Sequence, residues 1–279
     1  MFTLNCRGKL LLLENPIVMG IINATPDSFY EGSRFVGKDE ILERAGKMIA
    51  EEVDIIDIGG QSTRPGSTSI SPEEELQRVI EGIQAVHKHF PHAIISIDTY
   101  YSSVAEQAVR NGASMVNDIS AGTMDKEMLR TVAQLNVPYV LMHMKGTPQT
   151  MQQEANYQNV TREVLDFFIQ KKYECNKAGI FDIIFDPGFG FAKTIEHNFE
   201  LLRNISAFKI LDAPLLVGVS RKSSIYKTLA VDRGDALNGT TVLNTIALMN
   251  GTNILRVHDV KEAKEAVKLC SQIYKVEGA

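Results

Sequence analysis

The sequence predicts an α/β fold, namely a single (β/α)8 TIM barrel with a short N-terminal hairpin. Three observations lead to this prediction. The chain has 279 residues, close to the ~250 residues that one such barrel occupies. Eight apolar runs of strand length alternate with helical patterns. No linker or change of composition interrupts this order, so we expect one closed barrel rather than two domains.

The eight runs are almost continuously apolar, as expected for strands of a parallel sheet that is covered on both faces. They span residues 17–22, 54–58, 93–97, 114–116, 139–142, 182–185, 215–219 and 253–257. Gly8 lies in the middle of the preceding segment and suits the turn of a hairpin. We therefore expect residues 1–13 to form a hairpin that closes the barrel bottom, and residues 14–279 to form the barrel.

Helical patterns separate the runs, and one of them has an especially clear start. Ser71 can cap this helix, Pro72 suits its first position, and Glu74 completes a capping box. Gly112 and Gly179 are placed to end two other helices. The expected helices span residues 38–52, 72–88, 102–111, 125–135, 159–177, 195–210, 235–249 and 260–276.

Composition and charge argue against several classes of function. The 34 acidic and 29 basic residues give a net charge of −5, which disfavours a general binder of nucleic acid or of anionic membranes. No apolar run reaches the ~18 residues of a membrane span, and the first residues lack the order of a signal peptide. We therefore expect a cytoplasmic protein. Cys6, Cys175 and Cys270 form no CxxC pair, so neither disulfides nor a thiolate zinc site is indicated.

Familiar cofactor motifs occur only in incomplete form. Residues 32–39 nearly spell a phosphate-binding P-loop, but Asp39 stands where a hydroxyl should meet magnesium. Gly188 and Gly190 lack the third glycine of the dinucleotide fingerprint, so the sequence implies neither ATP nor NAD. Three histidines crowd one expected helix end, where a solvated cluster is commoner than a metal site. They are His87, His89 and His92.

Polar residues and a pair of glycines follow the expected strands at the points where the apolar runs stop. Carboxyl ends of barrel strands converge on one rim, so these residues would face one pocket. Helix capping explains any single position, but caps need no cations, and several positions carry Arg or Lys. A pocket is therefore favoured. The residues are Asn23, Gly59, Gly60, Asp98, Asn117, Asp118, His143, Asp186, Ser220, Arg221, Lys222, Arg256 and His258.

Two loops after strands, at residues 23–29 and 59–67, are long and rich in polar and turn-forming residues. Inert surface connectors can have the same composition. Arg64, however, is flanked by hydroxyl side chains and followed by Pro65 and Gly66, and a guanidinium can make forked contacts to phosphate or carboxylate. The last two strand ends also carry cations, in the region where barrels often bind phosphate. We therefore expect an anionic, phosphorylated ligand.

Seven of the eight strand ends carry sequences that together resemble one known family. In chain order they are MGIINATPDSF (19–29), DIGGQSTRPGS (57–67), SIDT (96–99), VNDIS (116–120), DPGFGF (186–191), SRKS (220–223) and RVHDV (256–260). The chain resembles the dihydropteroate synthases over nearly its whole length. Two departures are small: Gln61 replaces the glutamate common before STRP, and Tyr30 begins a Tyr-Glu-Gly sequence where Ser-Asp-Gly is more usual.

The resemblance implies a transferase of folate biosynthesis and a target of sulfonamides. Such an enzyme condenses 6-hydroxymethyl-7,8-dihydropterin diphosphate with p-aminobenzoate to give 7,8-dihydropteroate and diphosphate, and we expect an SN1-like route. The catalytic residues that the resemblance implies are Lys222, Arg64, Asp98 and Asp186. The implied pterin-binding residues are Asp98, Asn117, Ile119, Met142, Asp186, Phe191 and Lys222.

The resemblance also implies where the other groups bind. The diphosphate would lie against Asn23, Arg64, Arg256 and His258, with Mg²⁺ coordinated through Asn23. The implied contacts of p-aminobenzoate are Thr63, Arg64, Pro65, Lys222, Ser223 and Phe29. The partners are thus small molecules, and members of the family usually form homodimers, although no residue pattern identifies the dimer surface.

Three other interpretations stay open. A barrel of the methyltetrahydrofolate methyltransferase kind would share the pterin contacts but would not need the TPDSF, STRP, SRKS and RVH segments. A paralogue that binds pterin without catalysis would have degraded loops, whereas these loops look intact. An unrelated barrel for phosphorylated ligands would be favoured only if Asp98, Asn117 and Asp186 pointed away from a common pocket.

Overall fold

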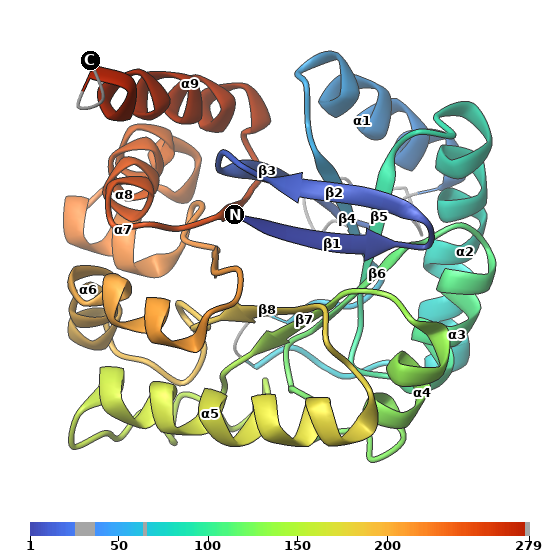
Figure 1. Cartoon of the computed structure of the whole chain (residues 1–279), viewed down its shortest axis with the longest axis horizontal. Coiled ribbons are helices and arrows are strands. Elements are labelled where there is room, and N and C mark those ends of the chain that lie inside the picture. Colours follow the sequence, from blue (N-terminus) through green and yellow to red (C-terminus); the bar gives the residue numbers. More distant parts are fainter. Residues whose placement is uncertain (26–36, 64–65, 277–279) are drawn as a thin grey trace.

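The computed structural model describes residues 1–25, 37–63 and 66–276, and it has the predicted (β/α)8 architecture. Parallel strands form a barrel surrounded by helices, and an antiparallel hairpin lies across one end (Figure 1). The strands are β1 (Phe2–Cys6), β2 (Lys9–Leu13), β3 (Ile17–Asn23), β4 (Ile55–Gly59), β5 (Ile94–Asp98), β6 (Met115–Asp118), β7 (Tyr139–Met142), β8 (Ile183–Asp186), β9 (Leu216–Val217) and β10 (Ile254–Val257).

Helices cover the outside of the barrel and follow the strands in the expected alternation (Figure 1). They are α1 (Lys38–Ala50), α2 (Pro72–His89), α3 (Ser102–Arg110), α4 (Met128–Leu135), α5 (Val160–Ala178), α6 (Ile195–Arg203), α7 (Ser223–Leu229), α8 (Leu237–Met249) and α9 (Val260–Val276), with 3-10 turns η1 (Ile205–Leu211) and η2 (Arg233–Asp235). The Ser71 side chain accepts a hydrogen bond from Glu74 N at 3.2 Å, so the predicted cap of α2 is confirmed.

The barrel closes at a seam between β8 and β9. The sheet order is β8-β7-β6-β5-β4-β3-β10-β9. β9 pairs with β10 at only two register positions, and a single parallel bridge from Phe185 to Leu215 joins it to β8. The strand predicted over residues 215–219 is therefore mostly irregular, because regular backbone pairing on both sides is limited to a few residues at the seam.

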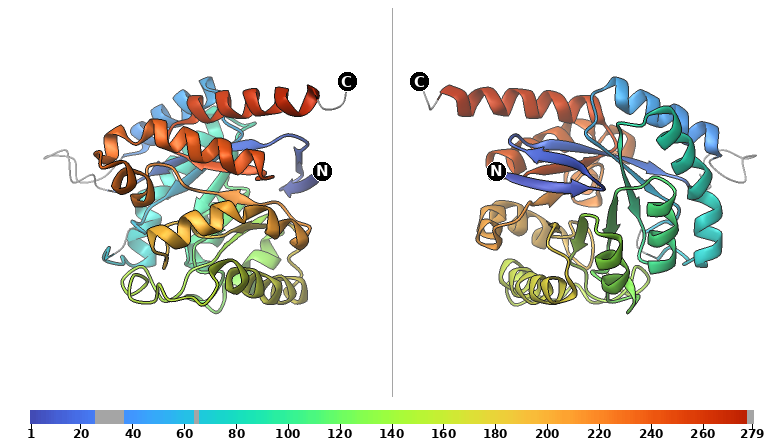
Figure 2. Two further views of the ribbon diagram at one scale, coloured as in Figure 1. Left: turned by 90° about the vertical axis from the view of Figure 1, so that its left-hand side faces the viewer. Right: turned by 45° about the vertical axis from the view of Figure 1, so that its right-hand side comes forward.

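Apolar side chains of the hairpin fill the amino-terminal end of the barrel. The two views in Figure 2 show the hairpin lying against this end. Asn5 N also donates to the Asp182 carboxylate at 2.8 Å, which ties the hairpin to the start of β8. The opposite end is therefore the one that is open to ligands. The buried side chains of this apolar plug are Leu4, Cys6, Leu13, Ile17, Met19, Ile55, Met115, Val140, Ile184, Leu216 and Ile254.

Four helix predictions need correction. The helix expected over residues 125–135 begins only at Met128, after a turn closed by a hydrogen bond of 3.1 Å from Met128 N to the Asp125 carbonyl. The helix expected over residues 195–210 ends at Arg203, because Asn204 leaves helical geometry (φ −102°, ψ 14°) and a 3-10 turn follows. The helix expected over residues 235–249 begins only at Leu237, after the turn η2. Helix α7 was not predicted, because seven residues are too few to establish a helical period.

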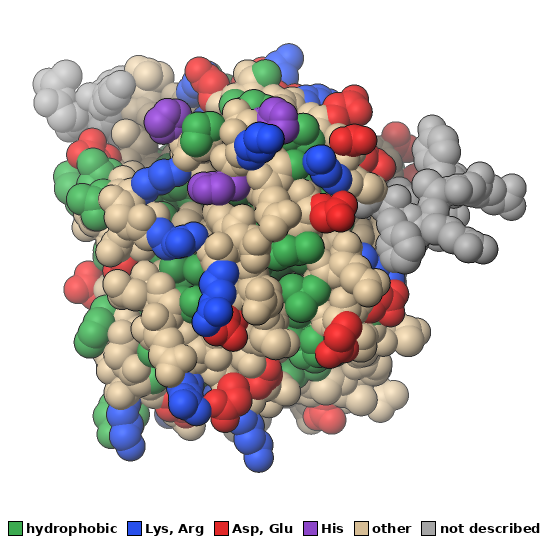
Figure 3. Space-filling view, turned by 90° about the vertical axis from the view of Figure 1, so that its right-hand side faces the viewer, with side chains coloured by type: hydrophobic (Ala, Val, Ile, Leu, Met, Phe, Trp, Pro, Cys, Tyr) green, Lys and Arg blue, Asp and Glu red, His purple; other side chains and the backbone are tan. Residues whose placement is uncertain are grey.

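The described residues contain no helix of sufficient length and apolar character to cross a bilayer. All three cysteines are buried and free. The three histidines at the end of α2 are exposed, and His89 Nδ1 lies 2.9 Å from the Ala85 carbonyl. Figure 3 shows histidines gathered in the upper part of the face that carries α2 and α3. Within residues 1–25, 37–63 and 66–276, no group of three or more His, Cys, Asp or Glu side chains could hold a metal.

Candidate active site

Rim residues from different strands come together at the carboxyl end of the barrel. Asp98 ends β5 and pairs in register with Asn117 on β6, while Asp186 ends β8 opposite Met142. The three polar side chains are at most 9% exposed. Burying two carboxylates is unfavourable unless cations or hydrogen-bond donors face them, so the surroundings of these groups define the site.

Arg256, on β10, supplies one of these cations. Its Nε donates to Asp57 Oδ2 at 2.7 Å and its Nη2 donates to Asp98 Oδ2 at 2.5 Å. Asn117 Nδ2 donates to the same Asp57 oxygen at 2.9 Å. Burial raises the pKa of Asp98, Arg256 opposes this effect, and Asp57 adds to it. Sequence reasoning missed Asp57, which is fully buried within an apolar run.

Asp186 and Lys222 form the second charged part of the site. Asp186 Oδ1 accepts a hydrogen bond from Gly188 N at 2.8 Å. Gly188 has a φ of +72°, and a Cβ there would lie 2.1 Å from the His143 carbonyl oxygen, so this turn requires glycine. Burial lowers the pKa of Lys222 to about 8, while Asp186 acts to raise it. Lys222 is therefore mostly protonated at neutral pH, and its Nζ donates to the Phe189 carbonyl.

An apolar wall lies beside these charges. Ile119, Met142 and Phe191, which were predicted as wall residues, belong to one cluster with Tyr100. The Lys222 ammonium lies 4.8 Å from the centre of the Phe191 ring, which is within the range of a cation–π interaction. The site thus combines a flat apolar surface with polar groups.

Lys193 is a second buried lysine that sequence reasoning missed. It is 3% exposed, and its Nζ lies 3.0 Å from both the Phe191 carbonyl oxygen and His143 Nδ1. Burial lowers the pKa of Lys193 to about 7 and the pKa of His143 to about 2. The ring of His143 is therefore neutral, and Lys193 fixes the turn that carries Phe191.

Side chains also join the loops after β9 and β10. Ser220 Oγ lies 3.0 Å from His258 Nδ1 and accepts from His258 N at 3.2 Å. Arg221 makes a forked ion pair with Asp259, at 2.8 and 2.9 Å. These contacts brace the neighbouring Lys222 and His258 on the side of the barrel where β9 is short.

The loop after β4 is anchored at its base. Gln61 Oε1 accepts from Ile70 N at 2.9 Å and from the Tyr100 hydroxyl at 2.8 Å. Beneath it lies Glu75, which is fully buried and accepts from Thr99 Oγ1 at 3.1 Å. Gln61, the departure from the usual glutamate, thus holds the two ends of the loop together.

For the remaining predicted site residues, the structure gives only their positions in the fold or does not describe them. Asn23 ends β3, Thr63 lies after β4, and Ser223 is the first residue of α7. Each is partly exposed. Phe29, Arg64 and Pro65 were also predicted to bind substrates, and they lie outside the described residues.

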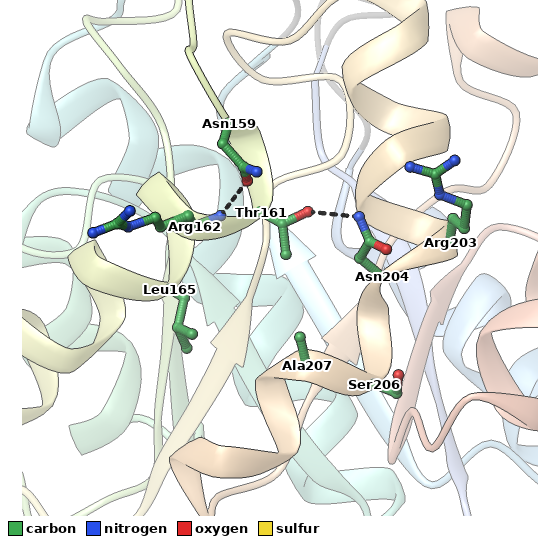
Figure 4. Close-up of a pocket in the computed structure, with 8 residues that line it drawn as sticks. All are labelled: Asn159, Thr161, Arg162, Leu165, Arg203, Asn204, Ser206 and Ala207. Carbon is green, nitrogen blue, oxygen red and sulfur yellow. Dashed lines mark hydrogen bonds between the residues drawn. The ribbon is translucent and has the colours of Figure 1, made fainter.

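One pocket of about 450 Å³ lies away from the rim, on the helical surface between α5 and η1 (Figure 4). Its lining includes Asn159, Arg162 and Arg203, and a hydrogen bond of 3.1 Å from Asn204 Nδ2 to Thr161 Oγ1 crosses it. None of the predicted site residues lines this pocket, so we do not assign the reaction to it.

The fold and the rim define a barrel enzyme of the pterin-binding class. The family model described as pterin binding enzyme matches residues 19–258. The chain is 42% identical to the dihydropteroate synthase of Escherichia coli K12 over 265 residues, covering 94% of this chain and 93% of the relative. It therefore belongs to the pterin binding enzyme family and, within it, to the dihydropteroate synthases, which are transferases.

Solved structures agree with this assignment. A Yersinia pestis dihydropteroate synthase in complex with a sulfonamide drug superposes with a TM-score of 0.93 at 38% identity, covering 98% of this chain and 100% of the other. A Xanthomonas albilineans dihydropteroate synthase with 4-aminobenzoic acid gives a TM-score of 0.91 at 36% identity, covering 98% of both chains.

Proposed function

We propose that this chain condenses 6-hydroxymethyl-7,8-dihydropterin diphosphate with p-aminobenzoate, releasing diphosphate and 7,8-dihydropteroate. The observation that carries the proposal is the convergence of Asp98, Asn117, Asp186 and Lys222 from four barrel segments beside one apolar wall. The name of the Escherichia coli relative and the 4-aminobenzoic acid in the Xanthomonas albilineans structure support it.

The polar groups suit the edge of a pterin ring. A pterin presents an amino group and ring N–H donors together with a carbonyl acceptor. Asp186 uses one carboxylate oxygen for Gly188 N, so its other oxygen can accept from the amino group, while Lys222 can donate to the carbonyl. Asn117 and Asp98 face the remaining ring nitrogens. A wrong ring would leave a buried polar group unpaired, at a cost of about 1–3 kcal/mol.

The reaction breaks a carbon–oxygen bond, so the enzyme must stabilise a leaving diphosphate. In the SN1-like route the bonding electron pair leaves with the diphosphate oxygen, and the exocyclic carbon becomes a cation delocalised into the dihydropterin. The neutral amine of p-aminobenzoate then forms the new carbon–nitrogen bond and releases a proton. Arg256 uses Nε and Nη2 for its carboxylate partners, which leaves Nη1 for the diphosphate, together with His258 and Arg64.

We also propose that the diphosphate binds with Mg²⁺ coordinated through Asn23. The side chain of Asn23 has no hydrogen-bond partner among the described residues and offers a neutral amide oxygen at the rim. Mg²⁺ takes most of its ligands from water and phosphate, so one amide is a sufficient protein ligand. When bound, Mg²⁺ would offset negative charge on the diphosphate.

A homodimer is a further part of the proposal. Helix α8 exposes Val242, Ile246 and Met249, which recur at helical spacing on one face, and the adjoining α9 exposes Leu269 and Ile273. Exposed apolar side chains on two adjoining helices favour burial against another molecule. A sedimentation measurement tests this: a monomer at micromolar concentration would contradict it.

The test of the reaction is diphosphate release by purified protein with the pterin diphosphate and Mg²⁺, with and without p-aminobenzoate. We expect release tied to dihydropteroate formation, and loss of both in the Lys222→Ala and Arg64→Ala variants. Tight pterin binding with no product at any p-aminobenzoate concentration would overturn the proposal in favour of a binding protein or a methyltransferase. Titration with Mg²⁺ alone and with diphosphate tests the metal separately, since binding should require both.

A further inference from the structure

Ser220 and His258 make two contacts that together restrict where their hydrogens lie. Ser220 follows the short strand β9 and is 3% exposed, and His258 follows β10 on the same rim. The backbone N–H of His258 donates to Ser220 Oγ at 3.2 Å, and the same Oγ lies 3.0 Å from His258 Nδ1. The first contact has a fixed direction, because a backbone N–H only donates. The second contact has a direction that depends on the imidazole tautomer.

Hydrogen-bond accounting selects one direction for the second contact. A serine hydroxyl has one hydrogen to donate. Among the described residues, His258 Nδ1 is the acceptor within reach of that hydrogen. If Nδ1 carried a proton instead, Ser220 would accept twice and its own buried hydrogen would have no partner. Leaving such a donor unpaired is unfavourable, so the hydroxyl donates and Nδ1 accepts.

We infer that Ser220 is a positioning residue, which holds His258 as the neutral tautomer with its proton on Nε2. Nδ1 is occupied by the hydroxyl, so Nε2–H is the group that the ring can offer to a ligand at the rim. The assignment of the tautomer does not depend on the proposed function. The identity of the ligand does rest on it, because the acceptor that Nε2–H would meet is a diphosphate oxygen.

The charges around His258 favour the same neutral ring. Burial, together with the charges of Arg256, Arg233 and Arg221, lowers the pKa of His258 to about 4, and Asp259 opposes them. Asp259 is held by the forked contact to Arg221, so its charge is already matched. His258 therefore adds a directional donor to the site without adding a further positive charge.

The decisive measurement is the tautomer itself. We would record long-range ¹H–¹⁵N spectra of the full chain labelled with ¹⁵N-histidine at neutral pH and assign the His258 signals with a His258→Gln variant. We expect an unprotonated Nδ1 and a protonated Nε2 in the wild type. Ser220→Ala should give a mixture of tautomers, and Ser220→Thr, which keeps the hydroxyl, should restore the wild-type pattern. Ser224→Ala, a buried serine on α7, is the matched control and should leave the signals unchanged.

Kinetics connect the tautomer to the reaction. Ser220→Ala should raise the KM for the pterin diphosphate about five- to tenfold, less than the loss of a whole hydrogen bond to an anion because a mixture of tautomers keeps part of that bond, and Ser220→Thr should recover it. A protonated Nδ1 in the wild type, or an unchanged tautomer in Ser220→Ala, would overturn the inference while leaving the proposed function intact. Failure of the wild type to form dihydropteroate would overturn the proposed function, and the spectra would still decide the tautomer.

Discussion

The two ends of the barrel are built from the same strands but hold opposite kinds of side chain. On β4, β6, β8 and β10, the inward-facing residue of the apolar plug is followed two positions later by a polar residue of the rim. The four pairs are Ile55 and Asp57, Met115 and Asn117, Ile184 and Asp186, and Ile254 and Arg256. Residues two apart on a strand point to the same face, so each strand passes from core to site within one repeat.

The residues that stabilise the fold and the residues proposed to bind substrate are therefore only about 7 Å apart, the length of two residues in a strand. The apolar plug buries the hairpin against the barrel and does not contact the substrate. The rim keeps carboxylates close together with Arg256 and Lys222, an arrangement that contributes little to folding and much to recognition. Variants at the two ends should therefore change different measured quantities.

The largest effect is expected at the rim. Lys222→Ala removes the cation beside Asp186 and Phe191, and we expect kcat/KM to fall about 100- to 1,000-fold, the scale of losing one aligned donor in an active site. The melting temperature should change little. Lys227→Ala, an exposed lysine on helix α7, which begins directly after Lys222, is the control. Comparable activity losses in both variants would show that the rim charge is not the cause.

The next effect belongs to the plug. Ile184→Ala leaves a cavity between the hairpin and the barrel, and we expect the free energy of unfolding to fall by about 2–5 kcal/mol. The two KM values should stay near those of the wild type, because Asp186 remains on the same strand. Denaturant unfolding measures the first quantity and steady-state kinetics the second. A large change in the pterin KM with unchanged stability would contradict the division between the two ends.

The sequence was informative where a polar residue ends an apolar run. Asp98, Asn117 and Asp186 could be placed at one rim because parallel strands in a barrel align their carboxyl ends. Asp57 could not, because it lies inside an apolar run and an isolated acid there has no pattern to mark it. Lys193 could not either, because its burial depends on how the turn before it folds back onto His143.

Lengths of short elements were equally hard to predict. The two-residue strand β9 and the seven-residue helix α7 are set by the seam between β8 and β9, a property of the closed barrel that no local run of residues encodes. The roles taken from the family resemblance for Phe29, Arg64 and Pro65 stay predictions, since these residues lie outside the described part of the chain.

A comparable effect on stability, confined to high pH, is expected beneath the rim at Glu75. Burial raises the pKa of this carboxyl to about 8 from 4.5, although the Thr99 hydroxyl acts to lower it. The folded chain then keeps a proton that the unfolded chain releases above pH 4.5, so the stabilising effect is lost as the pH rises from 4.5 to 8. Glu75→Gln, which stays neutral, should raise the free energy of unfolding by up to about 4 kcal/mol at pH 8, where the shift of the pKa from 4.5 to about 8 counts almost in full.

Denaturant unfolding at pH 5 and pH 8 tests this expectation. The two forms should have similar stability at pH 5 and diverge at pH 8. The exposed neighbour Glu73, varied to Gln, is the control. A Glu75→Gln variant that is less stable than the wild type at both pH values would show that Glu75 is ionised in the folded protein.

The smallest effect concerns the loop after β4, where rim and surface meet. Gln149 Nε2 donates to the Ser67 carbonyl at 2.9 Å and to Ser69 Oγ at 2.7 Å, and Gly66 N donates to the Pro148 carbonyl at 3.1 Å. The loop after β7 thus holds the far part of the loop expected to contact p-aminobenzoate. Because these bonds are exposed, Gln149→Ala should raise the KM for p-aminobenzoate only about threefold, with the pterin KM unchanged. Gln152→Ala, an exposed neighbour, should change neither value, and equal effects in the two variants would show that this contact does not position the loop.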